Sequence, residues 1–206
     1  MTRFLSSTRL KNRCACLCSA EGRAFYIAIN TVPQLSYSMS SLDRFMSMAT
    51  LAHLTYAKVA LHYLIGIKKR QLTWCGQRVS LPHVLGEILS FVDSSWADDK
   101  NNRRSFMPYY LFAINATFSW RVTLSQIIAL NTTEPELMVL ASCCCDVIWV
   151  RKLALKLGFL QLKPTNDCED STGCIFFANN MHLRGHDGRS KHIILRIRFI
   201  LQLIQD

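Results

Sequence analysis

Acidic residues are scarce in this chain, and so are long apolar runs. The 206 residues include 14 Asp and Glu against 24 Lys and Arg, a formal net charge of +10 at pH 7. A positive excess favours a polyanionic partner such as nucleic acid, although most charged clusters on proteins only face water. The longest uncharged run, residues 24–42, contains Pro33, Gln34 and four serines, so it is a poor membrane span. We therefore expect no transmembrane segment.

The nine cysteines lack the paired spacing that a structural zinc site requires. Three of them alternate over residues 14–18 and three are contiguous over residues 143–145. Three consecutive side chains on a helix point in three directions, so they cannot share one metal. We interpret the cysteines as small buried or half-buried residues of a reducing compartment.

In residues 1–23, four basic side chains, Arg3, Arg9, Lys11 and Arg13, precede the first acid, Glu21. This composition is typical of an organelle transit peptide, and a basic disordered leader fits it equally well. The compartment stays open, with the cytoplasm or nucleus favoured over an organelle.

Hydrophobic periodicity predicts short strands followed by helices. Apolar residues at helical spacing indicate helices over residues 48–67, 133–157, 171–179 and 191–205. Short strands are expected over residues 72–75, 87–93, 107–114, 116–122 and 163–168. One strand that returns between later helices is typical of a mixed α/β fold.

Asp93 lies within a short apolar segment, residues 91–96, with the sequence FVDSSW. A carboxylate beside Val92 and Trp96 is costly to bury unless it is hydrogen-bonded, paired or bound to a metal. Asp93 is therefore the first candidate for chemistry.

Several short motifs occur in an order that resembles one known family. Residues 29–46 read INTVPQLSYSMSSLDRFM, residues 53–58 read HLTYAK, and SWR, TEPEL and KHI follow at residues 119–121, 133–137 and 191–193. This order is similar to the end of the reverse transcriptase and the ribonuclease H domain of copia-type retrotransposon Pol polyproteins. The resemblance covers most of the chain.

The resemblance implies a fold and a domain order. Residues 84–206 would form a ribonuclease H-like mixed sheet of about five strands with flanking helices. Residues 28–80 would be a mainly helical reverse-transcriptase tail, and residues 1–27 stay unassigned. The remainder of the polyprotein is expected to be missing, and the Tyr-x-Asp-Asp motif of a polymerase palm is absent from this sequence. Polymerisation is therefore excluded for this chain.

The resemblance also implies a set of site residues. Three of the family's four site carboxylates fall on Asp93, Glu136 and Asp170, whereas the fourth position is Ile194. Asp187, in the segment before the last helix, is an alternative source of the fourth acid. As the sequence stands, the site is one ligand short.

Such a site would hold two Mg²⁺ ions and hydrolyse RNA in RNA–DNA hybrids. One ion generates the attacking hydroxide and the other stabilises the leaving oxygen. Because Mg²⁺ prefers oxygen ligands, carboxylates must converge on it. The residues expected to contact the nucleic-acid backbone are Arg103, Arg104, Arg189, Lys191 and Arg196.

Other departures from the family favour a degenerate or truncated copy. Ser95 replaces the second Asp of the family's strand, and VTL at residues 122–124 follows SWR where the family commonly has a Ser-Lys-Lys run. The loss of two positive charges weakens electrostatic contact with phosphates.

Each site residue also has a structural interpretation. Glu136 could close a capping box with Thr133, Asp170 could cap the helix that follows it, and Asp93 could face water on an edge strand. With Ile194 in place of an acid, the alternative function is a non-catalytic nucleic-acid-binding or interaction remnant of a polyprotein. A third interpretation is an unstable product with exposed apolar surface.

Overall fold

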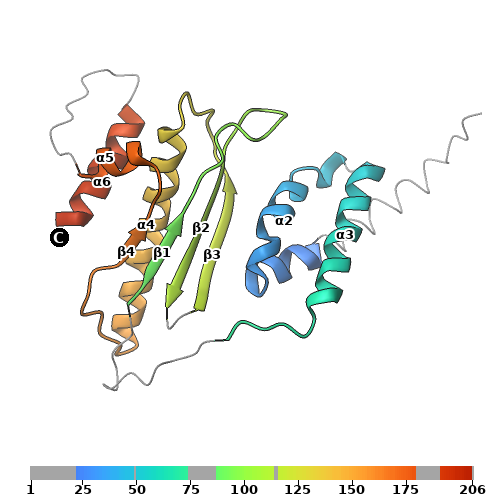
Figure 1. Ribbon diagram of the computed structural model, residues 1–206, viewed down its shortest axis with the longest axis horizontal. Coiled ribbons are helices and arrows are strands. Elements are labelled where there is room, and N and C mark those ends of the chain that lie inside the picture. The colour runs from blue at the N-terminus through green and yellow to red at the C-terminus, as the bar shows by residue number, and fades with distance from the viewer. Residues whose placement is uncertain (1–21, 49, 74–86, 114–115, 180–190, 206) are drawn as a thin grey trace, which may run out of the picture. The chain divides into compact units, whose positions relative to one another are not determined.

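The computed structural model describes residues 22–48, 50–73, 87–113, 116–179 and 191–205. The chain divides into two compact units, Met1–Leu72 and Thr73–Asp206 (Figure 1). Most of the expected leader, residues 1–21, lies outside the described residues. None of the helices within these ranges is long and apolar enough to cross a membrane.

The first unit is helical. Its elements are a helix over residues 22–30, the 3₁₀ turn η1 (Pro33–Leu35), helix α2 (Ser36–Asp43), the 3₁₀ turn η2 (Met46–Met48) and helix α3 (Leu51–Ile67). Ala24, Ala28 and Ala60 are buried against Leu35 and Met39 in a small apolar core. Such small side chains allow close contact between helices, so this unit builds its core from few large residues.

Helix α3 confirms the helix expected over residues 48–67, with a start at Leu51. Thr50 is extended and forms a capping box with His53, whose Nδ1 accepts a hydrogen bond from the Thr50 N–H at 3.0 Å. The His53 ring also stacks on Phe45, with 4.4 Å between the ring centroids. The cap fixes the start because it satisfies N–H groups that the first turn leaves free.

The second unit is a four-stranded mixed sheet with helices packed against it (Figure 1). Its strands are β1 (Leu89–Val92), β2 (Phe106–Ala113), β3 (Ala116–Leu124) and β4 (Asn166–Cys168), in the spatial order β3-β2-β1-β4. The pairs β1–β2 and β2–β3 are antiparallel, and β1–β4 is parallel. The mixed sheet is confirmed. Residues 72 and 73, where a further strand was expected, are not in a strand, and residues 74–75 lie outside the described ranges.

In its described residues the second unit has three helices, close to the ranges that the sequence predicts, and β4 lies between the first and the second of them. They are α4 (Thr133–Lys156), α5 (Thr172–Asn179) and α6 (Lys191–Gln205). Helix α4 ends before Gly158, whose φ of +84° is the left-handed conformation that glycine adopts most readily. Helix α4 packs on β1 and β2, and α5 and α6 pack on α4.

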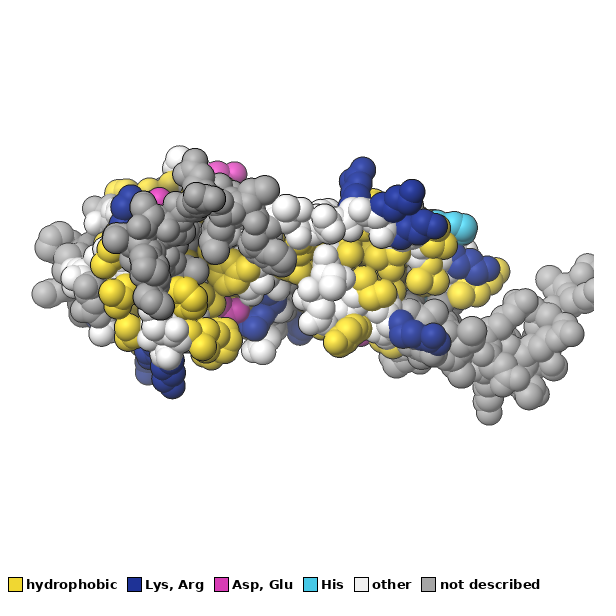
Figure 2. Space-filling view, turned by 90° about the horizontal axis from the view of Figure 1, so that it is seen from below, with side chains coloured by type: hydrophobic (Ala, Val, Ile, Leu, Met, Phe, Trp, Pro, Cys, Tyr) yellow, Lys and Arg dark blue, Asp and Glu magenta, His cyan; other side chains and the backbone are white. Residues whose placement is uncertain are grey.

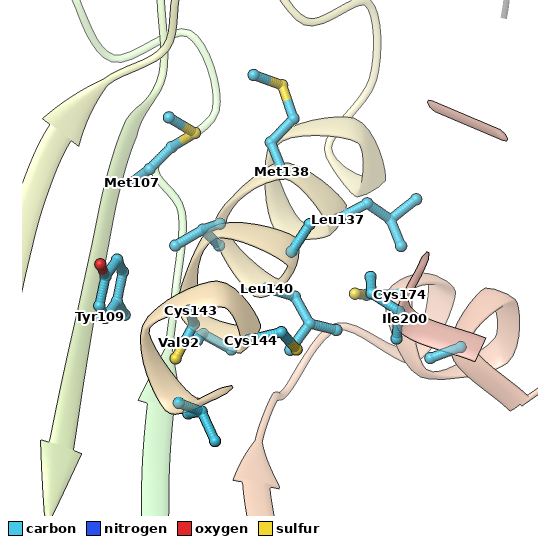
Figure 3. Close-up of a cluster of buried hydrophobic side chains, with 14 of the residues drawn as sticks. Val92, Met107, Tyr109, Leu137, Met138, Leu140, Cys143, Cys144, Cys174 and Ile200 are labelled. Carbon is cyan, nitrogen blue, oxygen red and sulfur yellow. The ribbon is translucent and has the colours of Figure 1, made fainter. Parts of the chain in front are cut away.

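The core of this unit lies on both sides of α4. Figure 3 shows side chains of α4 directed toward Met107 and Tyr109 of the sheet and, on the other side, toward Cys174 and Ile200 of α5 and α6. Cys143, Cys144 and Cys174 are buried within it, whereas Cys145 and Cys168 are exposed. Two of the three contiguous cysteines thus serve as small core residues.

The surface carries apolar as well as basic side chains. Leu130 and Met48 are 87% and 80% exposed. On the face in Figure 2, hydrophobic side chains and Lys or Arg are prominent in both units, and Asp and Glu are few. The positive excess of the sequence is therefore visible at the surface.

Candidate functional site

Acidic residues follow two neighbouring strands at the same edge of the sheet. Asp93 comes directly after β1, and Glu169 and Asp170 come directly after β4. Because β1 and β4 are parallel, their carboxyl ends meet at one edge. Glu136, in the first turns of α4, interacts electrostatically with all three of these carboxylates. The edge thus brings together Asp93, Glu136 and Asp170, and it adds Glu169.

The start of α4 is capped by other residues than the sequence predicted. Helix α4 begins at Thr133 itself, so Thr133 cannot be its cap. Instead the Asn131 Oδ1 accepts the Glu134 N–H at 2.9 Å, and the Glu134 Oε2 accepts the Leu130 N–H at 2.9 Å. The interpretation of Glu136 as a capping-box residue is wrong, because Asn131 and Glu134 take that role. The Glu136 carboxylate has no role in capping α4, so it is available at the sheet edge.

Glu136 is buried without a hydrogen-bond partner for one of its oxygens. The residue is 8% exposed, and its Oε2 has no partner. Burial raises the pKa of Glu136 from its usual 4.5 to about 7, the nearby Ser94 hydroxyl lowers it in part, and Glu169, Asp93 and Asp170 raise it further. An ionised carboxylate in this position is unfavourable unless a cation joins it.

The backbone pairing of β1 with β2 continues past the end of β1. The Asp93 N–H donates to the Pro108 carbonyl at 3.2 Å, and the Ser95 N–H donates to the Phe106 carbonyl at 3.0 Å. Side chains of a paired strand alternate between the two faces. Asp93 therefore shares the face of Phe91, which is exposed.

Ser94, rather than Asp93, lies on the face that α4 covers. Alternation places Ser94 with Val92, which is buried in the core against α4. Ser94 lies close enough to Glu136 to lower the pKa of that carboxyl. On the other face, burial raises the pKa of Tyr110 and the Asp93 charge raises it further. Asp93 and Glu136 are thus neighbours across the sheet edge.

Glu169 lies on the α4 face as well. In β4, the Asp167 carboxylate accepts hydrogen bonds from the Ser90 hydroxyl and, at 3.8 Å, from the Cys144 thiol of α4. Two residues later the alternation brings Glu169 to the same side. The Glu169 Oε1 accepts the Ser171 N–H at 2.9 Å, whereas its Oε2 is buried without a partner. Burial raises the pKa of Glu169 above its usual value.

Glu169 was not predicted from the sequence, because the resemblance to the family's motif placed the third carboxylate at Asp170. The alternation of acids at Asp167 and Glu169 was the available signal, since it places both on one side of the strand. Asp170 itself is exposed. The two acids after β4 therefore differ in burial as well as in position.

The side-chain oxygens at this edge are of the types that bind divalent cations. Mg²⁺ takes carboxylate and hydroxyl oxygens and keeps several water molecules. In the part of the chain that the structure describes, no group of three or more His, Cys, Asp or Glu side chains is placed to hold a metal ion. The two-ion set that the resemblance implies stays a prediction, and its members Asp93 and Asp170 lie within electrostatic range of Glu136.

The other predicted residues lie on two further elements. Ile194 is half-buried on α6. Arg103 and Arg104 lie between β1 and β2, Lys191 and Arg196 lie on α6, and Arg189 and Asp187 fall outside the described residues. Arg103 has a φ of 55°, and its Nη1 donates to the Ala97 carbonyl at 3.5 Å. The turn that follows Asp93 therefore carries basic side chains.

A close approach between α5 and α4 holds the edge together. A Cβ on Gly173 would lie 2.7 Å from the Thr133 Oγ1 and 3.3 Å from its Cγ2. We expect Gly173→Ala to lower the free energy of unfolding by about 1–2 kcal/mol, because both branches of Thr133 are in the way. Urea denaturation, followed by circular dichroism, measures this change in the free energy of unfolding.

Gly66→Ala is the matched control for this prediction. Gly66 lies within α3, and a Cβ there would meet nothing within 4 Å. The Gly66→Ala substitution should stabilise α3 by up to about 1 kcal/mol. An equal gain in both variants would contradict the contact between Gly173 and Thr133.

Three curated proteins match almost the whole chain. It is 27% identical over 188 residues to the "Retrovirus-related Pol polyprotein from transposon TNT 1-94" of Nicotiana tabacum, covering 91% of this chain and 13% of that protein. It is 27% identical over 185 residues to the polyprotein from transposon RE1 of Arabidopsis thaliana, and 26% over 185 residues to that from transposon RE2. The chain is homologous to copia-type Pol polyproteins. The homology confirms the resemblance seen in the sequence.

The homologous region is a small part of those relatives. The chain spans 12–13% of their length. A shorter protein, "Secreted RxLR effector protein 161" of Plasmopara viticola, is 29% identical over 133 residues, which are 64% of this chain and 89% of that protein. No protein-family model matches the chain, and no solved structure matches it. A similar sequence thus also forms most of a protein far shorter than a polyprotein.

Proposed function

We propose that the second unit, Thr73–Asp206, is a ribonuclease H-like domain that binds RNA–DNA hybrids and hydrolyses their RNA strand with Mg²⁺. The observation that carries the proposal is the convergence of four carboxylates at one sheet edge, with Glu136 buried and one of its oxygens unpartnered. The homology to Pol polyproteins over about nine tenths of the chain supports it.

The residues of this chain have separate roles in that proposal. Bound Mg²⁺ would supply a hydroxide and stabilise the leaving oxygen. Asp93, Glu136 and Asp170 would hold the ions, and Glu136 would lose its proton because a nearby positive charge favours the carboxylate. Arg103 and Arg104, in the turn after Asp93, would contact the phosphates of the hybrid. These contacts fix the position of the duplex and carry no sequence information.

A second candidate function is nucleic-acid binding without catalysis. It is favoured by Ile194, which stands where the family's fourth acid is expected, and by the opposite faces of Asp93 and Glu136. The net charge of +10 and the basic residues beside the edge would still attract a nucleic acid. Binding then needs no metal.

Cleavage of a labelled RNA–DNA hybrid by the full chain tests the first candidate. We expect the RNA strand to be cut in Mg²⁺ or Mn²⁺, and the Asp93→Asn rate to be lower by more than about 100-fold, since a lost ligand weakens a metal effect of several kcal/mol. Asp43→Asn, a change in the first unit, should cut at the original rate.

Hybrid binding at rising salt concentration separates the candidates. Binding that weakens steeply with salt, without cleavage above Asp93→Asn, would favour the second candidate. A chain that neither cuts nor binds the hybrid would contradict both.

A further inference from the structure

Exposed apolar side chains gather at the end of helix α4 and in the segment that follows it. The large apolar residues exposed there include Trp149, Leu153, Leu157, Leu160 and Leu162. Trp149 is 64% exposed and Leu162 is 70% exposed. Single exposed leucines are common on proteins, whereas a group of neighbouring ones indicates an interaction surface. We call the exposed side chains of residues 149–163 the distal surface.

The distal surface is also basic. From residue 147 to residue 166 the sequence has four Lys and Arg and no Asp or Glu. Lys152 and Lys156 are exposed, and each lies three residues after an exposed apolar residue of α4, so it is a neighbour of that residue on the helix surface. A nearby acid, Glu87, accepts a hydrogen bond from the side-chain amide of Asn166. The distal surface therefore combines apolar side chains with positive charge.

Hydrogen bonds hold the backbone of the distal surface in place. The Phe159 N–H donates to the Ala154 carbonyl at 2.9 Å, which closes the end of α4. The Arg151 Nη1 donates to the Lys163 carbonyl at 2.9 Å and to the Thr165 Oγ1 at 3.3 Å. The segment after α4 is thus tied back to the helix, and its leucines are presented from a packed backbone.

The distal surface lies at the opposite end of α4 from the candidate carboxylates. Glu136 is in the first turns of this helix, whose 24 residues span about 36 Å. Figure 1 shows α4 following the length of the strands, with its end at the bottom of the view, and Figure 2 shows hydrophobic side chains beside Lys and Arg from below. A partner at the distal surface would therefore leave the carboxylates accessible.

The chemistry of the distal surface excludes several occupants. A second copy would bring like charges together, which is unfavourable. Single-stranded nucleic acid stacks its bases on aromatic rings, and most of the apolar side chains here are leucines. A partner helix needs a groove, whereas Leu157 and Leu162 are mostly exposed and so project from the surface. An anionic lipid surface accepts projecting apolar side chains and attracts Lys and Arg.

We propose that the distal surface binds an anionic membrane surface as a peripheral contact. Trp149, Leu157 and Leu162 enter the headgroup region, where the indole ring and the leucines leave water. Lys152 and Lys156 keep their ammonium groups at the lipid headgroups while their stems lie along the apolar side chains. This interaction goes beyond the proposed function and does not depend on it, because it uses the other end of α4.

Flotation of the full chain with lipid vesicles tests the distal surface, since bound protein rises with the vesicles and aggregated protein does not. We expect flotation with vesicles of equal parts phosphatidylserine and phosphatidylcholine, and binding at least about 10-fold weaker to phosphatidylcholine alone. Leu162→Ser should weaken binding about 10-fold, because one leucine side chain stays in water. Lys152→Gln with Lys156→Gln should weaken it about 30-fold, or about fivefold for each charge.

Two matched controls separate the distal surface from general properties of the chain. Leu130→Ser removes a leucine that is 87% exposed before α4, and Lys68→Gln with Lys69→Gln removes two charges from the first unit. Both variants should bind the anionic vesicles as the original chain does. All these positions are exposed or lie outside helices and strands, so the far-ultraviolet circular dichroism of each variant should equal that of the original chain.

Each other outcome overturns the proposal. No flotation of the original chain removes the membrane as the occupant, and an equal loss in the two lysine pairs means that only net charge acts. A dimer that forms without vesicles and is lost in Leu162→Ser assigns the distal surface to a second copy. Displacement from the vesicles by a single-stranded oligonucleotide whose own binding needs Leu162 assigns it to nucleic acid.

Discussion

Glu136→Gln is expected to stabilise the second unit by about 2–3 kcal/mol at pH 8 in a metal-free buffer. Burial raises the pKa of Glu136 to about 7 from its usual 4.5. The folded chain therefore holds the proton to higher pH than the unfolded chain. This contribution is complete below about pH 4.5 and is lost as the pH rises through 7. A glutamine has no proton to lose, so the variant should keep its stability at pH 8.

Urea denaturation at pH 5.5 and pH 8 measures this difference. Burial shifts the pKa of Glu169 in the same direction, so some pH dependence should remain in the variant. Glu134→Gln is the matched control, because Glu134 lies in the same helical turn and is 5% exposed but its carboxylate accepts the Leu130 N–H. It should bring no gain at pH 8. The same slope with pH in all three proteins would refute the explanation.

Leu137→Ala is expected to lower the free energy of unfolding of the second unit by about 2–5 kcal/mol. Leu137 is 1% exposed and lies on α4 within the main core cluster (Figure 3). Its truncation removes apolar contacts and leaves a cavity, because Val139, Leu140 and Cys174 are fixed by their own packing. Urea denaturation at constant pH, with the midpoint and slope fitted separately, measures the loss.

Leu130→Ala provides the comparison for Leu137. Leu130 precedes the same helix and is 87% exposed, so its truncation should change stability by less than about 0.5 kcal/mol. A loss below about 1 kcal/mol in Leu137→Ala would mean that α4 does not bury this face as described.

The elements of the second unit could be predicted because their signals are local. The apolar stripe of residues 191–205 gives α6 in full, and β2 and β3 appear within two residues of their expected bounds. The cap of α4 could not be predicted in the same way. Asn131 and Thr133 are both good capping residues, and the choice depends on where the helical backbone begins, which is set by packing.

The location of the candidate site could be predicted from the sequence, but only some of its residues could. The position of Asp93 at the end of a strand follows from the sequence, whereas its face depends on pairing with Pro108 of β2. Glu169 was hidden because its neighbour Asp170 fits the family's motif. Its significance comes from the parallel pairing of β4 with β1, a contact between residues far apart in the chain.

The alternation of side chains at the sheet edge also affects how decay in such a copy is judged. A comparison of this chain with its relatives that counts acids one position at a time treats all carboxylates at the edge as one group. The two faces of the strands, however, can lose or gain acids independently. The acid expected at Ile194 is missing from α6, whereas Glu169 places an acid directly after β4. At this edge, sequence erosion and loss of chemistry therefore need not proceed together.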